Sequence, residues 1–392
     1  MPVPQAAIPG ESFSQPQTLP PLEIDRSLIK DSRLLPVADK LAQGKRLELD
    51  DGLALMQTTD ILGLGALADA ARWAKNGDRA YYVVNRHLNY SNVCVNKCSF
   101  CAFWKEAGAG GAYVMTPREA GAKAAEDPGL RIDEFHIVGS CHPELPLEYY
   151  LELLSEVKRA RPRAALKAFT PVEIDHMARA ADLPVDQVLA LLKERGLAGL
   201  PGGGAEIFSP PTRSKICPEK ISGQRWLEVS GRAHRLGLYS NATMLYGHLE
   251  SARERVEHLL ALRRQQDETG GFTAFIPLAF HPANTQLQEE VAPTTGLDDL
   301  RVIAASRLLL DNFPHIKAYW VMLGEKLAQV ALSFGADDLD GTIIEERITH
   351  SAGATTARGL TESRLRRLIT AAGFRPVRRD SFYQPVEDTL AA

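Results

Sequence analysis

The pattern of apolar positions changes period repeatedly between about residue 80 and residue 345. Short runs rich in β-branched and aromatic residues predict strands, and apolar positions three or four residues apart predict helices. The predicted strands are 81–89, 134–138, 165–169, 197–200, 239–244, 273–278, 316–321 and 341–344. The predicted helices are 117–125, 147–161, 172–195 with a break near residues 183–184, 219–236, 252–267, 297–312 and 325–333.

This alternation of strand and helix predicts an α/β fold with a parallel sheet and right-handed crossovers. About eight such units predict a (β/α)8-type TIM barrel, closed or nearly closed. Two or three helices over 38–76 predict an N-terminal helical extension, and 361–372 predicts a C-terminal helix. The expected domains are a flexible leader 1–36, a helical extension 37–80 packed on the barrel, the barrel 81–350 and a C-terminal extension 351–392.

Unusual polar or glycine-rich patches lie at the ends of the first six predicted strands: five follow their strand, and one, 241–248, overlaps the end of the fifth. They are 94–101, 139–142, 170–173, 201–206, 241–248 and 280–284. In a barrel of this type the loops at the carboxyl ends of the strands meet at one face. The sequence therefore predicts that these six patches converge on one pocket.

Composition excludes several classes of protein. The formal net charge is −4, from 45 basic and 49 acidic residues, with no basic run typical of nucleic-acid binding. No stretch of 18 apolar residues predicts a membrane span, and the first residues lack the pattern of a secretory signal. The five cysteines are an odd number with three close together, which favours a cytoplasmic, metal-binding protein over a disulfide framework.

The three close cysteines form the motif Cys94-Val-Asn-Lys-Cys98-Ser-Phe-Cys101. Thiolates at this spacing favour zinc, copper(I) or an iron–sulfur cluster. A structural zinc site needs four protein ligands, which Cys141, Cys217 or a histidine would have to complete. Three thiolates on a 4Fe–4S cluster instead leave one iron open for a chelating cofactor. We expect the cluster, with Cys141 and Cys217 as ordinary residues near the site.

At this motif the sequence resembles the radical S-adenosylmethionine (SAM) superfamily. The stretch 89–103 is similar to the group that contains aminofutalosine synthases, dehypoxanthine futalosine cyclases and deazaflavin synthases. The stretches 135–146, 167–177 and 200–208 resemble the aminofutalosine synthase family more closely. The segments 216–221, 240–248 and 275–282 also look familial, and the resemblance covers roughly residues 40–375.

The resemblance implies a 4Fe–4S cluster, SAM as a consumed co-substrate and an external electron donor such as flavodoxin or ferredoxin. It further implies a transferase of the futalosine route to menaquinone. The 5′-deoxyadenosyl radical would add to the enolpyruvyl double bond of 3-[(1-carboxyvinyl)oxy]benzoate, with rearrangement and decarboxylation, to give aminofutalosine. The alternative is the futalosine cyclase or a related enzyme whose radical abstracts hydrogen. A zinc-dependent hydrolase and an iron–sulfur carrier are the remaining alternatives.

Candidate site residues follow from these patches. The expected contacts to the cofactor are Phe100, Gly139, Ser140, Glu173, Gly203 and Glu206. Many superfamily members carry adjacent glycines where this chain has Gly139-Ser140. The expected catalytic residues are Asn241, His248 and His281, and the expected contacts to the substrate carboxylates are Arg86, His87 and Lys167. Each could instead be structural: a glycine run can be a turn, a histidine can be satisfied in the core, and a carboxylate can cap a helix.

Overall fold

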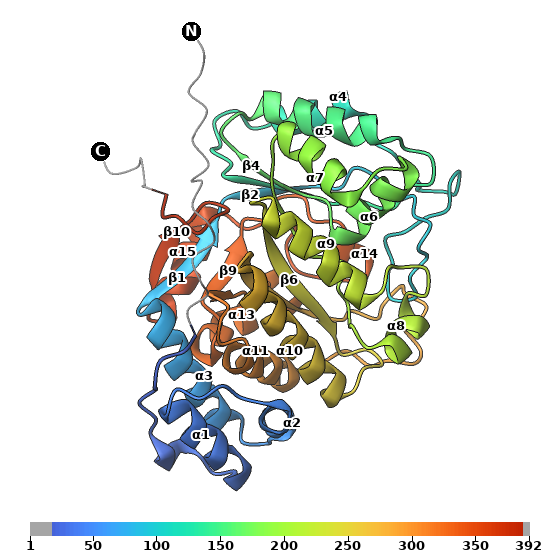
Figure 1. The fold of residues 1–392 in the computed structure, drawn as a ribbon. Coiled ribbons are helices and arrows are strands. Elements are labelled where there is room, and N and C mark those ends of the chain that lie inside the picture. Colours follow the sequence, from blue (N-terminus) through green and yellow to red (C-terminus); the bar gives the residue numbers. More distant parts are fainter. Residues whose placement is uncertain (1–17, 387–392) are drawn as a thin grey trace.

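The fold is built on seven parallel strands, in a computed structural model that describes residues 18–386. Strands adjacent in the sheet are also consecutive in the chain, so every connection is a crossover over one face. Figure 1 shows the sheet curved, with the crossover helices on its outer face. The strands, in sheet order, are β2 (Asn85–Leu88), β3 (Glu134–Ile137), β4 (Ala165–Ala168), β5 (Leu197–Leu200), β6 (Tyr239–Tyr246), β7 (Phe272–Ala279) and β8 (His315–Ile316).

The crossover helices begin where the sequence provides capping residues. Thr116, Thr170, Ser251 and Thr295 each form a capping box with an acidic residue three positions later, which satisfies backbone N–H groups at the helix start. The helices are α4 (Pro117–Ala125), α5 (Leu147–Ala160), α6 (Pro171–Ala180), α7 (Val185–Glu194), α8 (Pro210–Ile216), α9 (Gly223–Arg235), α10 (Ala252–Thr269) and α11 (Gly296–Leu309). The short helix α8 was not expected from the sequence, and α9 starts later than predicted.

A second sheet of three strands pairs a strand from the start of the fold with two strands from its end. Its order is β10 (Arg375–Arg378), β1 (Arg79–Val83) and β9 (Asp338–Gly341), all parallel. The single strand predicted over 81–89 is therefore two strands, because the chain changes partners at Val84: β1 pairs with β9 and β10, whereas β2 pairs with β3. A single β-rich run carries no signal of where the hydrogen-bonding partner changes.

The two edges of the seven-stranded sheet approach each other through the segment 338–344. An isolated bridge joins Lys317, just after β8, to Asp338 of β9, and another joins Arg86 of β2 to Ile344. The backbone N–H of His87 donates to the Ile344 carbonyl at 2.9 Å. The structure thus has a curved parallel sheet of seven strands, joined across its edges by single bridges and not by an eighth strand in the same ladder.

The N-terminal helices pack against the outside of the sheet's last crossovers. They are two short 3₁₀ turns (Arg26–Leu28 and Ser32–Leu34), α1 (Leu35–Ala42), α2 (Leu49–Gln57) and α3 (Ile61–Asn76). Helix α2 contacts α10 and α11, and α3 contacts α11. Of the leader predicted as flexible over 1–36, residues 1–17 lie outside the described residues. From residue 18 onward it is docked, because Leu19, Leu22 and Leu34 are buried in the shared core.

The segment after β8 differs from the sequence prediction. Of the predicted strand 316–321 only Ile316 belongs to the two-residue strand β8, and Trp320–Leu323 is a short helix, α12. A short buried apolar run fits either element, and here the turn places Trp320 beneath β9, where its Nε1–H donates to the Gly341 carbonyl. The remaining elements are α13 (Glu325–Ala331), a 3₁₀ turn (Leu332–Phe334), α14 (Ile348–Ser351) and α15 (Glu362–Ala371).

Alternation along the first strands separates an outer face from an inner face. Leu88, Phe135, Ile137 and Leu166 lie in the core cluster between the sheet and helices α4, α5 and α7. The residues between them therefore face the interior of the curved sheet. Among the described residues, no helix is long and apolar enough to cross a membrane.

Candidate active site

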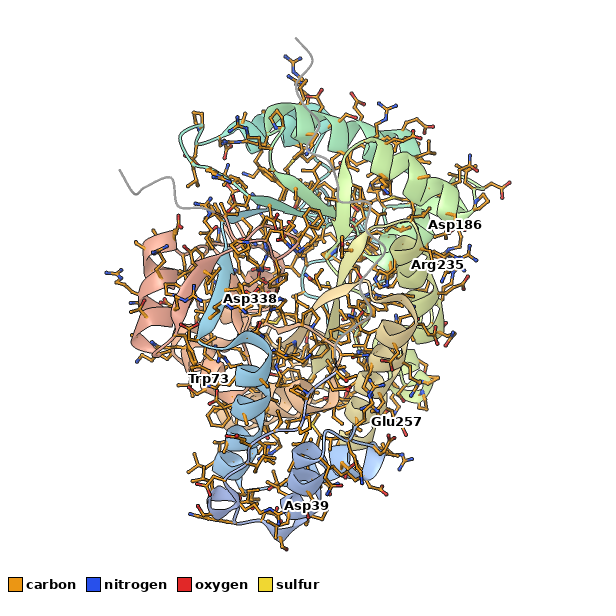
Figure 2. All side chains as sticks on the ribbon, turned by 60° about the vertical axis from the view of Figure 1, so that its left-hand side comes forward. Asp39, Trp73, Asp186, Arg235, Glu257 and Asp338 are labelled. Carbon is orange, nitrogen blue, oxygen red and sulfur yellow. The ribbon has the colours of Figure 1, made fainter. Side chains whose placement is uncertain are left out.

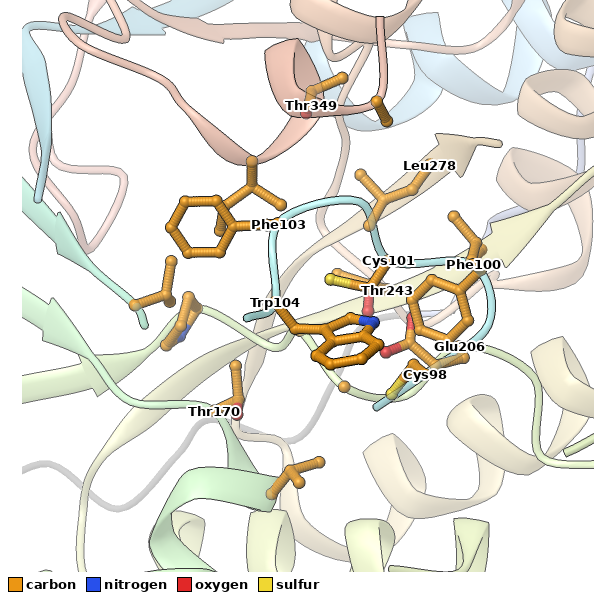
Figure 3. Close-up of a pocket in the computed structure, with 18 of the residues that line it drawn as sticks. Cys98, Phe100, Cys101, Phe103, Trp104, Thr170, Glu206, Thr243, Leu278 and Thr349 are labelled. Atoms are coloured by element: carbon orange, nitrogen blue, oxygen red, sulfur yellow. The ribbon is translucent and has the colours of Figure 1, made fainter. Parts of the chain in front are cut away.

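One cavity of about 290 Å³ lies at the carboxyl ends of the parallel strands. Its wall combines the cysteine loop after β2, the segments that follow β3, β4 and β5, inward residues of β6 and β7, and part of the chain between 340 and 352. Figure 3 shows the indole of Trp104 inside this cavity, with Cys98, Cys101, Phe100 and Glu206 around one side and Thr170 on the other. The predicted convergence of strand-end patches is thus visible in one place.

The cysteine loop is fixed by its backbone. The N–H of Cys94 donates to the Lys105 carbonyl at 3.2 Å, and the N–H of Val95 donates to the Cys141 carbonyl at 3.0 Å. The N–H of Ser99 donates to the Ile216 carbonyl at 2.9 Å, which ties the loop to the end of α8. Three segments far apart in sequence therefore hold the loop over the strand ends.

All three cysteines of the motif line the cavity. A hydrogen bond from Cys141 lowers the pKa of the Cys94 thiol to about 6, whereas burial raises the pKa of Cys98 and of Cys101. Within residues 18–386, no three His, Cys, Asp or Glu side chains are already grouped at the spacing of a metal site. The thiols share a cavity wall, and the binding of a metal cluster would bring them together.

The carboxylate of Glu173 orders the loop after β3. Its oxygens accept hydrogen bonds from Tyr90 Oη at 2.6 Å, from the Gly139 N–H at 3.0 Å and from the Thr170 N–H at 2.7 Å. A Cβ at Gly139 would lie 2.6 Å from the Tyr90 ring, so a larger residue does not fit there. Glu173 lines the cavity, yet its bonds show it holding the backbone at Gly139 and the start of α6.

Ser140 supplies an unpaired polar group beside the cysteines. Its Oγ is buried without a hydrogen-bond partner, and the residue lines the cavity. A buried hydroxyl without a partner is unfavourable by about 1–3 kcal/mol, so a polar ligand group at this point would satisfy it. The place where many superfamily members have a second glycine thus offers a hydroxyl in this chain.

The glycine run after β5 adopts a conformation that other residues resist. Gly202 and Gly204 both have φ of +84°, and a Cβ would lie 2.2 Å from the Asn241 carbonyl oxygen or 2.4 Å from Val172. The run turns the chain so that Gly203, Gly204 and Glu206 line the cavity. The predicted role of a glycine turn at the cavity wall therefore has a geometric basis.

Glu206 is paired with Lys220, a cavity residue that the sequence analysis did not single out. The Lys220 ammonium also lies 5.0 Å from the centre of the Phe100 ring. Burial opposes its charge, but Cys98 and Glu206 raise the pKa of Lys220 well above its usual value. A buried ammonium, a carboxylate and an aromatic ring thus stand together next to the cysteines.

The other predicted residues divide between the cavity and the fold. His87 and His281 line the cavity, and His281 Nε2 is 3.0 Å from the Met322 carbonyl. Lys167 is buried, with its ammonium 2.8 Å from the Glu134 carboxylate. It lies inside the curved sheet but does not line the cavity. Arg86 points outward, where it donates to the Lys123 carbonyl at the end of α4 and pairs with Asp127 at 2.6 Å.

Asn241 and His248 also lie away from the cavity wall. Asn241 accepts a hydrogen bond from Thr273 between β6 and β7. His248 is held within its own turn, where Nδ1 accepts from the Leu249 N–H at 2.7 Å. The predicted catalytic roles of Asn241 and His248, and the predicted substrate contact of Arg86, thus have no counterpart in this cavity; these side chains satisfy the protein's own hydrogen bonds.

Sequence reasoning missed several cavity residues. His136, Trp104, Thr243, Tyr319, Asp340 and Glu346 all line the cavity. His136 could have been found, because it alternates with Phe135 and Ile137 on a strand whose neighbour carries His87. The sequence carried no comparable signal for Asp340 or Glu346, since they lie beyond the part of the barrel whose strands were clearly marked.

A curved parallel α/β sheet with a three-cysteine loop at the end of its first strand, over one shared cavity, defines a radical SAM protein. The model of the Radical SAM superfamily matches residues 88–262, and that of the CofH/MqnC C-terminal region matches 269–391. A solved structure of methylornithine synthase has the same fold, with a TM-score of 0.69 at 18% identity over 87% of this chain and 97% of that one.

Curated relatives give the family. Aminodeoxyfutalosine synthase of Thermus thermophilus is 48% identical over 91% of this chain and 97% of its own length. The protein of the same name from Streptomyces coelicolor is 43% identical over 88% of this chain and 92% of its own. A 5-amino-6-(D-ribitylamino)uracil–L-tyrosine 4-hydroxyphenyl transferase of Methanopyrus kandleri is 39% identical over 90% of this chain and 95% of its own. The chain belongs to the aminodeoxyfutalosine synthase family.

The superfamily uses a 4Fe–4S cluster and SAM, and the residues present fit both groups. Three thiols on one wall, those of Cys94, Cys98 and Cys101, would hold the cluster. Around them, the unpaired Ser140 Oγ, the Glu206 carboxylate and the Lys220 ammonium offer polar partners for an amino acid and a ribose. The glycine turn brings Gly203 and Gly204 to the same wall.

Proposed function

We propose that this protein is an aminofutalosine synthase that acts on 3-[(1-carboxyvinyl)oxy]benzoate and SAM in the futalosine route to menaquinone. The single observation that carries the proposal is the 48% identity, over 91% of the chain, to an aminodeoxyfutalosine synthase. Neither chain leaves a domain-sized part unmatched, because 97% of the relative is covered as well. The cluster and SAM, when bound, supply a 5′-deoxyadenosyl radical for addition to the enolpyruvyl double bond.

The chain's own residues bind and shield the reactants. Cys94, Cys98 and Cys101 hold the cluster, while Ser140, Glu206 and Lys220 hold the polar groups of SAM. Phe100 offers a ring face beside them, and the Gly202–Gly204 turn allows backbone to approach the ligand. Glu173 acts through Gly139, by keeping the loop after β3 in place.

The substrate part of the cavity suits an aromatic ring. Its wall is mainly apolar and includes Phe103, Trp104, Leu245, Ile276, Leu278, Phe280, Tyr319 and Met322. Such a wall excludes water and offers the radical few polar competitors for the double bond. We infer that His281 lies at the rim of this part and contacts the substrate side.

Two further features belong to this proposal. The segment 338–344 acts as the eighth, closing strand of a nearly closed barrel, which is supported by the bridges Lys317–Asp338 and Arg86–Ile344. The reducing electron comes from an external donor such as flavodoxin or ferredoxin, because the chain's only close set of cysteines is the one in the cavity.

The test is an anaerobic incubation with reductant, the enolpyruvyl benzoate and SAM labelled in the adenosyl carbons. We expect the label in a covalent adduct that has lost one carboxylate, detected by mass spectrometry. If the label ends only in free 5′-deoxyadenosine, the addition is wrong and a hydrogen-abstracting reaction replaces it.

Two competing reactions are tested in the same experiment. Dehypoxanthine futalosine as substrate tests the cyclase. L-Tyrosine with 5-amino-6-(D-ribitylamino)uracil tests the reaction named for the Methanopyrus kandleri relative, which is 39% identical. Turnover with either pair, and none with the enolpyruvyl benzoate, would replace the proposed function and keep the radical SAM assignment.

A further inference from the structure

Two histidines share one level inside the curved sheet. In the β2–β3 pairing His87 is the partner of His136, and in the β3–β4 pairing His136 is the partner of Lys167. All three alternate with residues of the outer core, so they face inward. The imidazole rings of His87 and His136 are stacked, with centroids 4.4 Å apart and an angle of 14° between their planes.

Neither imidazole has a hydrogen-bond partner in the described part of the protein. Both side chains line the cavity, and His87 is only 7% exposed. The buried histidines His258 and His234 each have at least one partner: His258 Nε2 is 2.9 Å from the Thr243 carbonyl, and His234 bonds Ser240 and Thr269. The pair at the cavity therefore differs from His258 and His234 in having no hydrogen-bond partner on either imidazole ring.

Two buried imidazoles without hydrogen-bond partners destabilise the fold unless a ligand binds them. The inner level of a barrel is normally filled by branched apolar residues, and a buried polar group without a partner is destabilising. Burial lowers the pKa of His87 to about 3 and of His136 to about 4, so both rings are neutral near pH 7. A neutral imidazole has one N–H to donate, so together they can donate to both oxygens of one carboxylate.

The carboxylates around the pair already have partners. Glu134 is 2.8 Å from the Lys167 ammonium and accepts from Ser381. Asp340 is 3.2 Å from the Lys317 ammonium. Glu346 accepts from the Thr349 N–H at 2.7 Å and pairs with His350. A carboxylate entering the cavity therefore meets acids that already have partners, and two free N–H donors.

We propose that His87 and His136 form the seat of an aryl carboxylate, and that this seat holds the benzoate group of the substrate. The inference rests on the proposed function for the identity of that acid. His87 lies on β2, deeper in the sheet than the cysteine loop that follows it. The benzoate would thus bind at the inner end of the cavity, and the enolpyruvyl group would lie toward the cysteines, where SAM binds.

The probe is 3-methoxybenzoate, with 3-methoxybenzamide as its uncharged match. Binding is measured by calorimetry on the anaerobically reconstituted protein with SAM present. We expect the unaltered protein to prefer the acid, and His136→Gln and His87→Gln each to weaken its binding about tenfold while changing amide binding little. His176→Gln, whose ring lies outside the cavity and bonds the His142 carbonyl, should behave as the unaltered protein.

Two results would overturn the seat. One is equal binding of acid and amide by the unaltered protein, which needs no variant to fold. The other is a folded His136→Gln protein that keeps the full preference for the acid. In turnover, the variants should raise KM for the substrate and leave SAM binding unchanged, which a merely structural histidine would not do.

Failure of the seat and failure of the proposed function are distinguishable. If the protein forms the adenosylated product but the histidine variants keep their KM and their preference, the seat is wrong and the function stands. If the protein binds 3-methoxybenzoate through these histidines but makes no such product, the seat stands and the reaction acts on another aryl acid.

Discussion

At the scale of single residues, the cysteines of this protein differ in whether they line the cavity. Cys94, Cys98, Cys101 and Cys141 line the cavity, and the motif spacing makes the first three the proposed ligands of the cluster. Cys217 is buried behind them and does not line the cavity, and burial raises its pKa, which keeps it a thiol. Position relative to the cavity separates Cys217 from the other four thiols, and the motif spacing separates Cys141 from the three proposed ligands.

This difference is measurable as iron content. Cys98→Ala should remove one of three cluster ligands, and reconstituted protein should hold far less than about four irons per chain and have no activity. Cys217→Ala is the matched control and should keep the iron and most of the activity. Stoichiometric zinc in the unaltered protein, with activity in air, would contradict the cluster assignment.

The pair of Glu206 and Lys220 gives a second test at this scale. Glu206→Gln removes the negative charge, so the variant should bind SAM at least several-fold more weakly by equilibrium dialysis, while its fold is kept because the amide retains the size. Glu219→Gln, one residue before Lys220 on the exposed side, serves as control. Unchanged SAM binding and turnover in a folded Glu206→Gln protein would remove Glu206 from the SAM site.

At the scale of elements, the end of the chain secures the start of the barrel. Strand β10 pairs with β1, and beyond it Arg379 Nε donates to Asp338 of β9 at 2.7 Å, with both side chains fully buried. Tyr383 donates to the same carboxylate. Figure 2 shows Asp338 beside β1, above Trp73 of α3. The C-terminal segment is thus part of the sheet system that supports the strands below the cavity.

Breaking this buried pair should be costly. Arg379→Met leaves Asp338 without its guanidinium, which typically destabilises a protein by about 3–5 kcal/mol. Arg375→Met, at the start of β10, breaks the exposed pair with Asp78, just before β1, and should change stability by less than about 1 kcal/mol. Urea unfolding of the two variants gives the comparison, and equal losses would mean that the end of the chain does not secure the fold.

At the scale of the whole molecule, buried neutral histidines couple stability to pH. Burial lowers the pKa of His234 and of His258 to about 3, whereas a histidine in the unfolded chain titrates near 6.5. Below about pH 6.5 the unfolded state therefore binds protons that the folded state does not. Stability from these groups is complete above pH 6.5 and is lost as the pH falls toward 3.

The unfolding free energy should accordingly fall between pH 6 and pH 5, before most carboxylates titrate. Each such histidine adds a slope of up to about 1.4 kcal/mol per pH unit. His258→Gln should lower stability at pH 7, because the Thr243 contact is altered, yet make the slope shallower by about one proton. If the unfolding free energy of the variant depends on pH as steeply as that of the unaltered protein, His258 is not neutral in the folded state.

The sequence by itself determined most of the helices, most of the strands and the ligand motif. Hydrophobic period and capping residues are local, so α4, β5 and the break between α6 and α7 were predicted at or near their observed bounds. The cysteine spacing is local as well, and the family followed from it. The position of Glu206 on the cavity wall followed from a glycine turn directly after a strand.

Only the tertiary structure decided the partners. Whether Arg86 or His87 faces the cavity depends on which side of the strand the helices cover, and the structure turns Arg86 outward to the end of α4. The split between β1 and β2 and the pairing of β10 with β1 are contacts between distant segments, which no local pattern records. The stacked pair of His87 and His136 exists for the same reason, because the register of two strands, 49 residues apart there, places the rings side by side.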